Sequence, residues 1–301
     1  MPATLLFCSD PLNPRGVDDH FAAQAEAVRT ADGTVALLDH DALIAGDAAA
    51  AVRRVPRSAG TMWYRGWMIP VDRYRELAQA LSGRGCALAV SPECYAKAHE
   101  LPGWYEFFAE LTPRSRWTEA KPGEVPGESV LAGLAGSLGP GAGIVKDYVK
   151  SRKDEWDTAC FVPDLADVAA LRRVVERFLE LQGEYLAGGV VLREFEDFTD
   201  EGGGRAAEAR VWWLDGEPVL VGPHPDDPAV CPEPDLSVVA PAVSALGCRF
   251  VTTDIARRAD GSWRVIEVGD GQVSDLPPGV DAMALIGPLV AASSPAVPGG
   301  Q

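Results

Sequence analysis

Short apolar runs and amphipathic stretches take turns along the first hundred residues. The apolar runs predict four strands, at residues 4–8, 34–38, 61–69 and 86–90. The stretches between them place apolar residues at helical spacing and predict helices at 17–30 and 71–81. Strands that alternate with helices form βαβ units around a parallel sheet. We therefore predict an α/β domain over residues 1–112, whose last helical segment, 91–111, breaks near Pro102.

The second half of the chain has a different pattern. Helices are predicted at residues 128–138 and 165–181, and strands at 190–195, 209–214, 218–221, 249–257 and 263–268. Two connections carry Asp-Gly pairs, Asp215-Gly216 and Asp260-Gly261, which are typical of tight hairpins. Strands joined by hairpins are antiparallel, so we predict an α+β region over residues 113–292. The overall class is thus α/β followed by α+β, with a flexible Pro/Gly/Ser tail at 293–301.

Composition and charge narrow the class of protein. The chain has 301 residues, 47% of them hydrophobic, and a formal net charge of −17. A nucleic-acid-binding surface needs a basic face, so nucleic acid is not an expected partner. The six cysteines form no CxxC pair, which indicates reduced thiols. There is no basic signal-peptide start and no apolar run of about 20 residues, so we expect a cytoplasmic protein without a membrane partner.

A lysine-rich segment follows the glycines near residue 140. Along a strand, Lys146, Tyr148 and Lys150 would share one face. Two ammonium groups on one face repel each other unless an anion lies between them, and a polyphosphate would be such an anion. The alternative is an edge strand whose lysines point into water.

Acidic, aromatic and basic residues meet in the next two strands. The first strand ends in Arg193-Glu194-Phe195-Glu196, a segment whose backbone could face a purine edge. In the second strand, Glu208 could accept hydrogen bonds from ribose hydroxyls, and Arg210, one alternation away, could reach a phosphate. The alternative is an exposed hairpin on which Glu208 and Arg210 pair with each other and bind no ligand.

Two carboxylates lie in the apolar strands of the last predicted hairpin. Asp254 and Glu267 stand in neighbouring strands, where an unpaired carboxylate is costly. A hard cation with oxygen ligands, such as Mg²⁺, would relieve their repulsion and bind substrate phosphates as well. The alternative is that each carboxylate pairs with a nearby arginine, Arg257 or Arg264.

The order of these segments resembles the nucleotide-binding half of ATP-grasp enzymes. It is more specifically similar to the ATP-grasp branch named for its arginine and paired lysines. The matching pieces are Trp63-Tyr64-Arg65-Gly66-Trp67-Met68, Val145-Lys146-Asp147-Tyr148-Val149-Lys150-Ser151 and Ile266-Glu267-Val268-Gly269-Asp270-Gly271-Gln272-Val273-Ser274. The resemblance spans about residues 60–280. It implies a pre-ATP-grasp-like domain followed by a two-subdomain ATP-grasp fold.

The resemblance also implies a site for ATP. It places Lys146 at the α- and β-phosphates, the segment around Glu194 at adenine, and Arg210 at the γ-phosphate. The nucleotide-binding residues are then Lys146, Lys150, Arg193, Glu194, Phe195, Glu196 and Glu208. A lysine that relatives carry ahead of the Val-Lys strand has no obvious counterpart, and Lys97, Lys121 and Arg65 are all open candidates.

The same resemblance implies Mg²⁺ ligands and a substrate contact. Asp254 and Glu267 resemble the metal ligands, and the usual third ligand, an asparagine, is replaced by Gly269. We therefore expect Asp270, Gln272 or water in its place, with Asp270 as the third metal residue. Arg65 is expected to hold a substrate carboxylate by a bidentate contact. Its alternative is a structural arginine stacked on a neighbouring tryptophan.

The implied reaction is an ATP- and Mg²⁺-dependent ligation of a carboxylate to an amine through an acyl phosphate. Arg210, Lys150 and Arg65 are the residues expected at the reacting groups. Small-molecule or peptide acids and amines are the expected partners, and a homodimer is left open. Two alternatives also stay open: a kinase acting on a small molecule, and a degenerate ATP-grasp domain that only binds a partner.

Overall fold

A parallel four-stranded sheet in the order β2-β1-β3-β4 organises the N-terminal part of the chain. The computed structural model describes residues 3–198, 207–258 and 260–292. Its four parallel strands are β1 (Thr4–Cys8), β2 (Thr34–Leu38), β3 (Gly60–Arg65) and β4 (Cys86–Leu88). The predicted parallel sheet is confirmed, although β3 and β4 end before the predicted 69 and 90. The flexible tail predicted at 293–301 lies outside the described residues.

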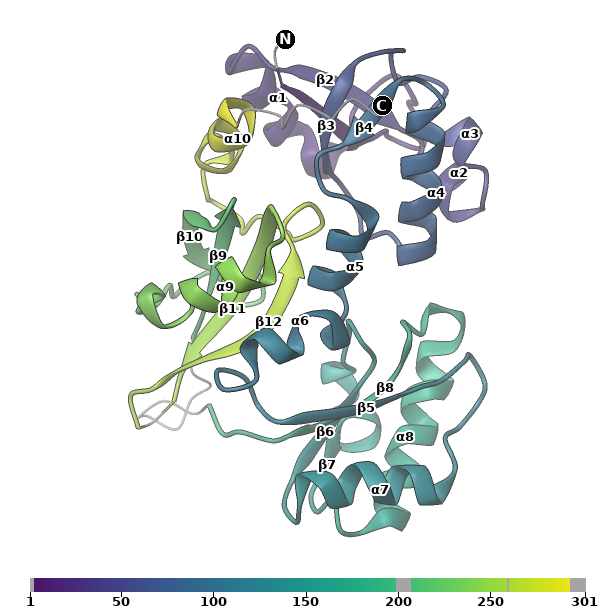
Figure 1. Ribbon diagram of the computed structural model, residues 1–301, viewed down its shortest axis with the longest axis vertical. Coiled ribbons are helices and arrows are strands. Elements are labelled where there is room, and N and C mark those ends of the chain that lie inside the picture. Colours follow the sequence, from purple (N-terminus) through teal and green to yellow (C-terminus); the bar gives the residue numbers. More distant parts are fainter. Residues whose placement is uncertain (1–2, 199–206, 259, 293–301) are drawn as a thin grey trace, which may run out of the picture. The chain divides into compact units, whose positions relative to one another are not determined.

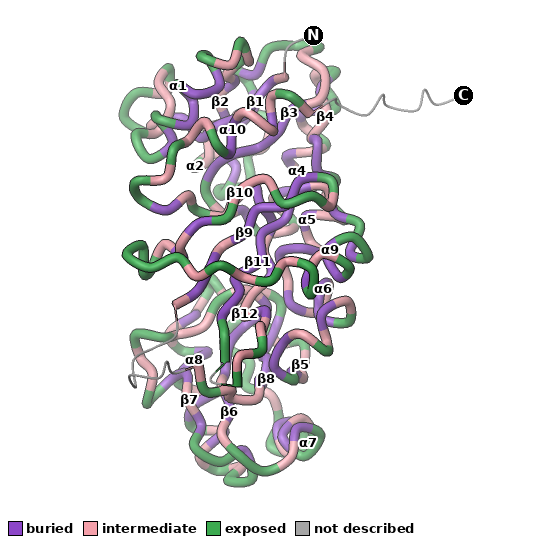
Figure 2. The backbone as a smooth tube through the Cα atoms, turned by 90° about the vertical axis from the view of Figure 1, so that its left-hand side faces the viewer, coloured by how far each residue is buried: buried purple, intermediate pink, exposed green. Residues whose placement is uncertain are grey.

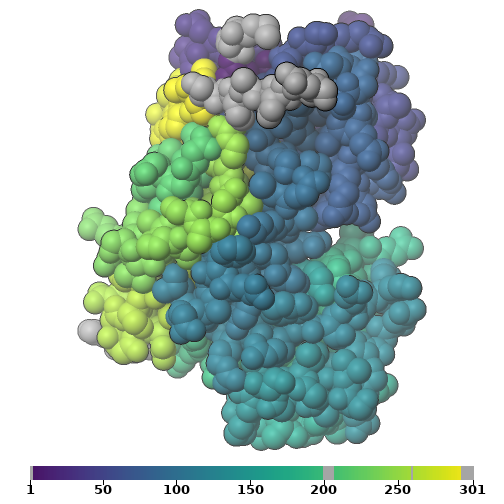
Figure 3. All heavy atoms as spheres, in the orientation of Figure 1, coloured from purple at the N-terminus to yellow at the C-terminus, as the bar shows by residue number. Residues whose placement is uncertain are grey.

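Helices cover both faces of this sheet (Figure 1). A short 3₁₀ turn, η1 (Asp19–Phe21), leads into α1 (Ala22–Thr30), which packs with α10 (Ala282–Ala291) on one face. The other face carries α2 (His40–Ile44), α3 (Ala48–Ala51) and α4 (Val71–Ser82). In Figure 3 the yellow atoms of α10 border the purple N-terminal segment. The helix α10, the last helix of the described residues, therefore completes the cover of the first sheet.

The contacts divide the chain into two units that do not follow its order. The first unit comprises Met1–Ala98, Ala207–Asp254 and Val268–Gln301, and the second comprises His99–Ala206 and Ile255–Glu267. This grouping ends the N-terminal stretch at Ala98, where α5 (Pro92–His99) ends, and not at the predicted residue 112. The predicted domain limits stay a prediction.

The first unit also contains antiparallel strands from the second half of the chain. Their sheet has the order β10-β9-β11-β12. Its strands are β9 (Glu208–Leu214), β10 (Glu217–Pro223), β11 (Phe250–Arg257) and β12 (Trp263–Asp270), with η5 (Leu236–Val238) and α9 (Ala240–Leu246) between β10 and β11. The end of β11 from Ile255 and the start of β12 up to Glu267 belong to the second unit. Asp215 and Gly216 both have positive φ, 51° and 89°, as the predicted hairpin turn requires. Trp212 and Phe250 share one buried core with the parallel sheet.

The second unit is built on an antiparallel sheet in the order β5-β8-β6-β7. The strands are β5 (Ser115–Glu119), β6 (Gly143–Lys146), β7 (Phe161–Val162) and β8 (Gly189–Glu194). Helices α7 (Glu128–Leu138) and α8 (Val168–Gln182) share a buried apolar core with this sheet. The remaining elements are α6 (Leu101–Phe108), η2 (Lys153–Glu155), η3 (Trp156–Cys160) and η4 (Gly183–Tyr185). The antiparallel character predicted for the second half is thus confirmed.

Burial follows the strands in both units. Figure 2 shows β1 as a buried segment, and all five of its residues are buried. The strand β11 is buried from Phe250 to Ala256 and turns exposed only at Arg257. No helix among the described residues is long and apolar enough to cross a membrane.

Candidate active site

Lys146 and Glu267 form an ion pair in the second unit. Lys146 ends β6 with its side chain 4% exposed, and its Nζ lies 2.5 Å from Oε2 of Glu267 on β12. Burial lowers the pKa of Lys146, the Glu267 carboxylate raises it, and Arg193 lowers it, with a net decrease. The Glu267 side chain is 30% exposed. Lys146 is therefore a buried cation paired with a partly exposed carboxylate.

The strand does not continue beyond Lys146 as predicted. Asp147 is fully buried, and its Oδ1 accepts from the backbone N–H groups of Val149 and Lys150. Its Oδ2 accepts from Gln182 Nε2 at 2.6 Å. These bonds close a turn, so the prediction that Lys146, Tyr148 and Lys150 share one strand face is wrong. Lys150 is exposed, and within the described residues its ammonium group has no hydrogen-bond or ion-pair partner.

The acidic and aromatic segment after β8 is tied into the second unit. The N–H of Glu194 donates to Arg114 O at 2.8 Å, and the N–H of Phe195 donates to Ala142 O at 2.9 Å. The carboxylate of Glu196 accepts two hydrogen bonds from Arg264, from Nε at 2.9 Å and from Nη2 at 2.6 Å. The predicted adenine contacts stay a prediction, and they cannot use these two N–H groups without breaking existing bonds.

Two further features border this segment. Arg193 is buried and donates to Ile266 O at 2.7 Å and to Thr112 Oγ1, which holds β8 against β12. Burial lowers the pKa of its guanidinium, and Glu267 and Glu196 raise it. Beside Phe195, the rings of Trp156 and Phe161 stack with centroids 5.2 Å apart and planes 13° apart. The segment thus offers aromatic surface, while Arg193 has structural contacts.

A buried polar cluster lies in the first unit. Arg210 on β9 donates from Nε and Nη2 to both oxygens of Asp254 on β11, at 2.7 and 2.8 Å. His224 Nε2 lies 3.0 Å from Arg210 Nη2 and 3.4 Å from Asp254 Oδ2. Burial raises the pKa of Asp254, but the charge and hydrogen bonds of Arg210, together with His224, lower it well below its usual range. Asp254 is therefore an anion whose two oxygens are both engaged.

Glu208 completes this cluster. It begins β9, is buried, and shares with His224 and Asp254 a set of ligand atoms that all lie within 4.8 Å of one another. Arg210 balances one of the two carboxylates, so Glu208, Arg210 and Asp254 together keep a negative charge. Oxygen-rich groups of this kind suit a hard divalent cation. His224 was not among the predicted residues.

Arg65 is buried away from solvent in the first unit. It is 0% exposed, and its Nη1 donates to the backbone oxygens of Gly271, Gln272 and Ser274 at 2.7 to 3.0 Å. Its Nε donates to Gln24 Oε1 at 2.9 Å. The tryptophan stacking considered for Arg65 belongs to Arg249, which lies 4.7 Å above the Trp63 ring. The contacts of Arg65 hold the loop after β12, and its predicted substrate contact stays a prediction.

Asp270 occupies an enclosed position at the end of β12. It is 0% exposed, and its Oδ1 accepts from Gln272 N and Gln272 Nε2, at 2.9 and 3.0 Å. Burial raises its pKa to about 7, against the lowering by Gln272 and Arg65. These contacts give Asp270 a role in fixing Gln272, while its buried Oδ2 has no hydrogen-bond partner among the described residues. Its predicted place as a metal ligand stays a prediction.

Residues 136–289 match the ATP-grasp domain of the arginine-and-two-lysines clade, family 3, which is just over half of the chain. The chain belongs to this family. The match covers the buried Lys146, the segment after β8 and the hairpin that carries Asp254 and Glu267. No curated protein sequence matches the chain.

Solved ATP-grasp structures share the fold of this ATP-grasp protein. The D-cycloserine synthetase DcsG superposes with a TM-score of 0.63 at 18% identity, covering 95% of this chain and 100% of that chain. A RimK domain protein from Sphaerobacter thermophilus DSM 20745 gives 0.59 at 14% identity, with 96% and 100% coverage. The ligase PsnB, complexed with minimal precursor, Mg and ADP, gives 0.55 at 16% identity, with 95% and 97% coverage. The predicted ATP-grasp architecture is confirmed over nearly the whole chain.

Proposed function

We propose that this ATP-grasp protein is an ATP- and Mg²⁺-dependent ligase that joins a carboxylate to an amine. The observation that carries the proposal is the buried Lys146, held by a single carboxylate in a domain of the ATP-grasp family. Burying a lysine in such a place has a large desolvation cost, and a site for anionic phosphates explains its retention. Structural neighbours include ligases crystallised with peptide precursors, Mg and ADP, which supports the same cosubstrate here.

The charged residues match the demands of phosphoryl transfer. A carboxylate oxygen of the acid attacks the γ-phosphorus, and ADP leaves with the electrons of the broken bond. The amine nitrogen then attacks the acyl carbon, releases phosphate and loses a proton. Negative charge spreads over the phosphoryl oxygens in the first step, and positioned cations stabilise it. Lys146 and Lys150 in the second unit and Arg210 in the first are the groups that we assign to this task.

The carboxylates fit a divalent cation. Asp254 and Glu208 supply buried oxygen donors, and Glu267 supplies a carboxylate with only one described hydrogen-bond partner. We assign a Mg²⁺ ion to Glu208 and Asp254 in the first unit, where it would neutralise phosphate charge when bound, and we propose Glu267 in the second unit as a further carboxylate able to bind Mg²⁺. Asp254 is already held by Arg210, so its part in binding a metal requires sharing its oxygens or releasing one of the two bonds.

The test is a turnover assay on pools of carboxylic acids. The protein, ATP and Mg²⁺ are mixed with each pool, first with an amine pool and then with hydroxylamine, and ADP release is measured. A ligase gives ADP with both, and the hydroxylamine reaction yields a hydroxamate from the acyl phosphate. Phosphate that stays on the product indicates a kinase. ATP binding without ADP release in any pool indicates a binding module, and either outcome overturns the proposal.

A further inference from the structure

Two cysteines that are far apart in the sequence meet in the first unit. Cys94 lies in the first turn of α5, and Cys248 lies between α9 and β11, 154 positions later. Sγ of Cys248 donates to the backbone oxygen of Cys94 at 3.5 Å. The two thiol groups also form a hydrogen bond with each other. The fold therefore forms a pair of thiols that the spacing of the cysteines in the sequence did not indicate.

Neighbouring contacts hold this pair in place. Nζ of Lys97, on the next turn of α5, donates to the backbone oxygen of Leu246 at the end of α9, at 2.5 Å. Oγ of Ser91 accepts from the backbone N–H of Cys94 at 3.2 Å, which satisfies a donor at the start of α5. The helix α5 and the segment after α9 are thus joined at two points, by Lys97 and by Cys248.

The two thiols differ in exposure and in their preferred charge. Cys94 is half-buried, whereas Cys248 is buried, so a reagent in solution reaches Cys94 more readily. The hydrogen bond from Cys248 lowers the pKa of Cys94, and burial raises it. Ser91 and Lys97 lower this pKa as well and Glu93 raises it, with a net decrease. The start of a helix also favours a thiolate, so Cys94 is the nucleophile of the pair.

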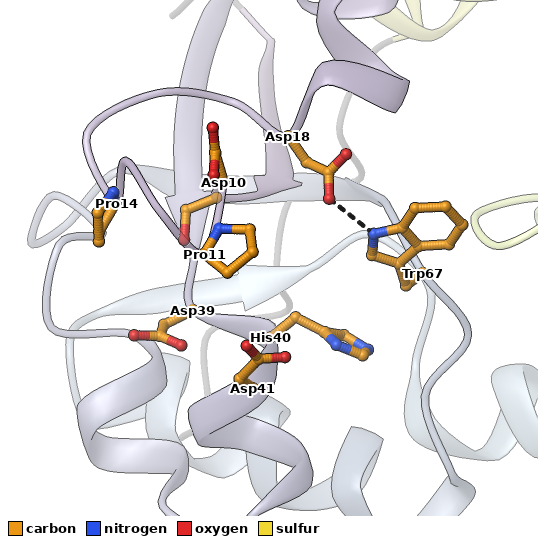
Figure 4. Close-up of a pocket in the computed structure, with 9 residues that line it drawn as sticks. Asp10, Pro11, Pro14, Asp18, Asp39, His40, Asp41 and Trp67 are labelled. Carbon is orange, nitrogen blue, oxygen red and sulfur yellow. Dashed lines mark hydrogen bonds between the residues drawn. The ribbon is translucent and has the colours of Figure 1, made fainter.

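Cys8 has the opposite surroundings. It directly precedes Ser9, one of the residues that line the cavity of about 170 Å³ in Figure 4. Its side chain is 0% exposed, and burial raises its pKa to about 11. The charges of Asp18 and Asp41, both labelled in Figure 4, add to this increase. A buried thiol beside carboxylates stays protonated and unreactive, which makes Cys8 a structural cysteine.

We propose that Cys94 and Cys248 form a reversible oxidation site that reacts with hydrogen peroxide. The Cys94 thiolate attacks one peroxide oxygen, the O–O bond breaks, and the leaving hydroxide takes up a proton to become water. The sulfur of Cys248 then attacks the sulfenic acid on Cys94, and its proton leaves with the hydroxyl group as a second water. Two thiols and one peroxide thus give one disulfide and two waters. Two equivalents of a small-molecule thiol reverse the reaction.

Oxidation of Cys94 also prepares Cys248 for the second step. The hydrogen bond to Cys94, burial and the charge of Cys94 all raise the pKa of Cys248. Conversion of the thiolate to a neutral sulfenic acid removes the charge and changes the hydrogen bond, so Cys248 gives up its proton more easily. The resulting disulfide fastens α5 to the segment that leads into β11. This site is independent of the ligase function proposed above, because neither cysteine is assigned to ATP, metal or substrate.

The test uses the full, reduced chain without ATP or Mg²⁺, treated with a small excess of hydrogen peroxide. We expect the intact protein to lose the mass of two hydrogen atoms, and peptide mapping to place one disulfide between Cys94 and Cys248. Dithiothreitol should restore the original mass. Cys94 should react at least about tenfold faster than the exposed Cys231. A disulfide between other cysteines, no disulfide at all, or earlier oxidation of Cys231 would overturn the proposal.

Serine variants separate the parts that the two cysteines play. In Cys248→Ser, oxidation should stop at a sulfenic acid on Cys94, which dimedone traps, whereas Cys94→Ser should give neither this adduct nor a disulfide. Cys231→Ser is the matched control, because the Cys231 thiol is exposed but donates to Pro232 O instead of a second cysteine. It should react as the native protein does. Equal dimedone labelling of the native and Cys248→Ser proteins would show that Cys248 does not complete the reaction, and would overturn the proposal.

The melting temperature reports whether the disulfide fastens the fold. A bond between residues 154 positions apart restricts the unfolded chain, so the oxidised native protein should melt at least about 5 °C above the reduced one. The melting temperature of Cys94→Ser should not respond to peroxide. An oxidised native protein that melts at the same or a lower temperature than the reduced one would overturn the fastening of α5 by this pair.

Discussion

The two buried ion pairs of the candidate site differ in how firmly each carboxylate is held. In the first unit, Asp254 receives two hydrogen bonds from Arg210, and both side chains are nearly enclosed, at 10% and 13% exposure. In the second unit, Glu267 receives one hydrogen bond from Lys146 and is itself 30% exposed. A planar guanidinium matches both carboxylate oxygens, whereas an ammonium group is a point charge on a flexible stem.

This difference determines how easily each ion pair can open and exchange its partner. Removing either Arg210 or Asp254 leaves the other as a buried charge without its partner, which lowers the free energy of unfolding. The Lys146–Glu267 pair can open with less penalty, because water already reaches Glu267 and burial weakens the hold of Lys146 on its proton by lowering its pKa. We expect the second pair to exchange its partner for nucleotide and metal more readily than the first, in which Asp254 must share an oxygen or release a bond to Arg210 before it can bind a metal.

The largest expected effect is on catalysis. Glu267→Gln keeps an acceptor for Lys146 Nζ and changes little volume, so its melting temperature should stay near the native value. Loss of the carboxylate should lower Mg²⁺-dependent ADP formation by about 100-fold or more. Glu119→Gln, at an exposed end of β5, is the control. A Glu267→Gln enzyme with native rate and native Mg²⁺ dependence would make this carboxylate purely structural.

The next effect is on stability and compares the two cations directly. Arg210→Met should lower the free energy of unfolding by about 3 kcal/mol, because Asp254 stays buried without its partner. Lys146→Met should cost less than about 1 kcal/mol, because Glu267 can be hydrated and a buried ammonium is removed. Urea unfolding of both variants checks this, and adding Asp254→Asn to Arg210→Met should restore part of the loss. Equal losses for the two single variants would remove the distinction between the pairs.

A smaller, pH-dependent effect probes the charge around Lys146. Burial, together with the charges of Lys150 and Lys146, lowers the pKa of His99 to about 3. The unfolded chain takes up this proton below about pH 6.5 and the folded chain does not, so stability falls as the pH drops from there toward 3. At pH 5 the loss should be about 2 kcal/mol.

The measurement is the difference in unfolding free energy between the native protein and His99→Asn from pH 7 to pH 5. The native protein should lose stability faster than the variant across this range. In a Lys146→Met background the difference should shrink, because one of the two cations that oppose protonation is gone. Parallel pH profiles would show that His99 does not stay neutral in the folded chain.

The smallest effect concerns geometry at constant charge. Arg210→Lys keeps the cation but offers only a point charge in place of the paired N–H donors that face Asp254. We expect a loss of about 1 kcal/mol in unfolding free energy. Urea midpoints of the native, Arg210→Lys and Arg210→Met proteins should therefore fall in that order. If the lysine variant were as stable as the native protein, charge alone would account for the pair.

Local sequence patterns predicted the helices and strands better than they predicted which residues contact one another. The parallel strands and the hairpin at Asp215 were found because their signals lie within a few residues. The strand at Ser115–Glu119 was missed because what makes it a strand is pairing with β8, more than 70 residues later. Likewise, the turn after Lys146 depends on Asp147 and its bond to Gln182, 35 residues away.

For the candidate site too, the sequence indicated individual residues but not their contacts. The residue types and their order indicated Lys146, Arg210, Asp254 and Glu267, and the structure buries or half-buries each of them. Their pairing was not predicted, since Lys146 meets Glu267 across 121 positions and Arg210 meets Asp254 across 44. His224 had no signal of its own. Its position in the chain, after β10 and directly opposite the start of β9, places it beside Arg210 only once that hairpin has formed.

The order in which a ribosome releases the chain does not match the order in which the units are completed. The parallel sheet emerges first, but α10, which covers one of its faces, is the last helix of the described residues to be made. Arg65 must likewise wait for the backbone of Gly271–Ser274 before its buried guanidinium finds acceptors. We therefore expect the first 98 residues to leave the ribosome as a sheet with apolar surface still exposed. They reach their final packing only after nearly the whole chain has been translated.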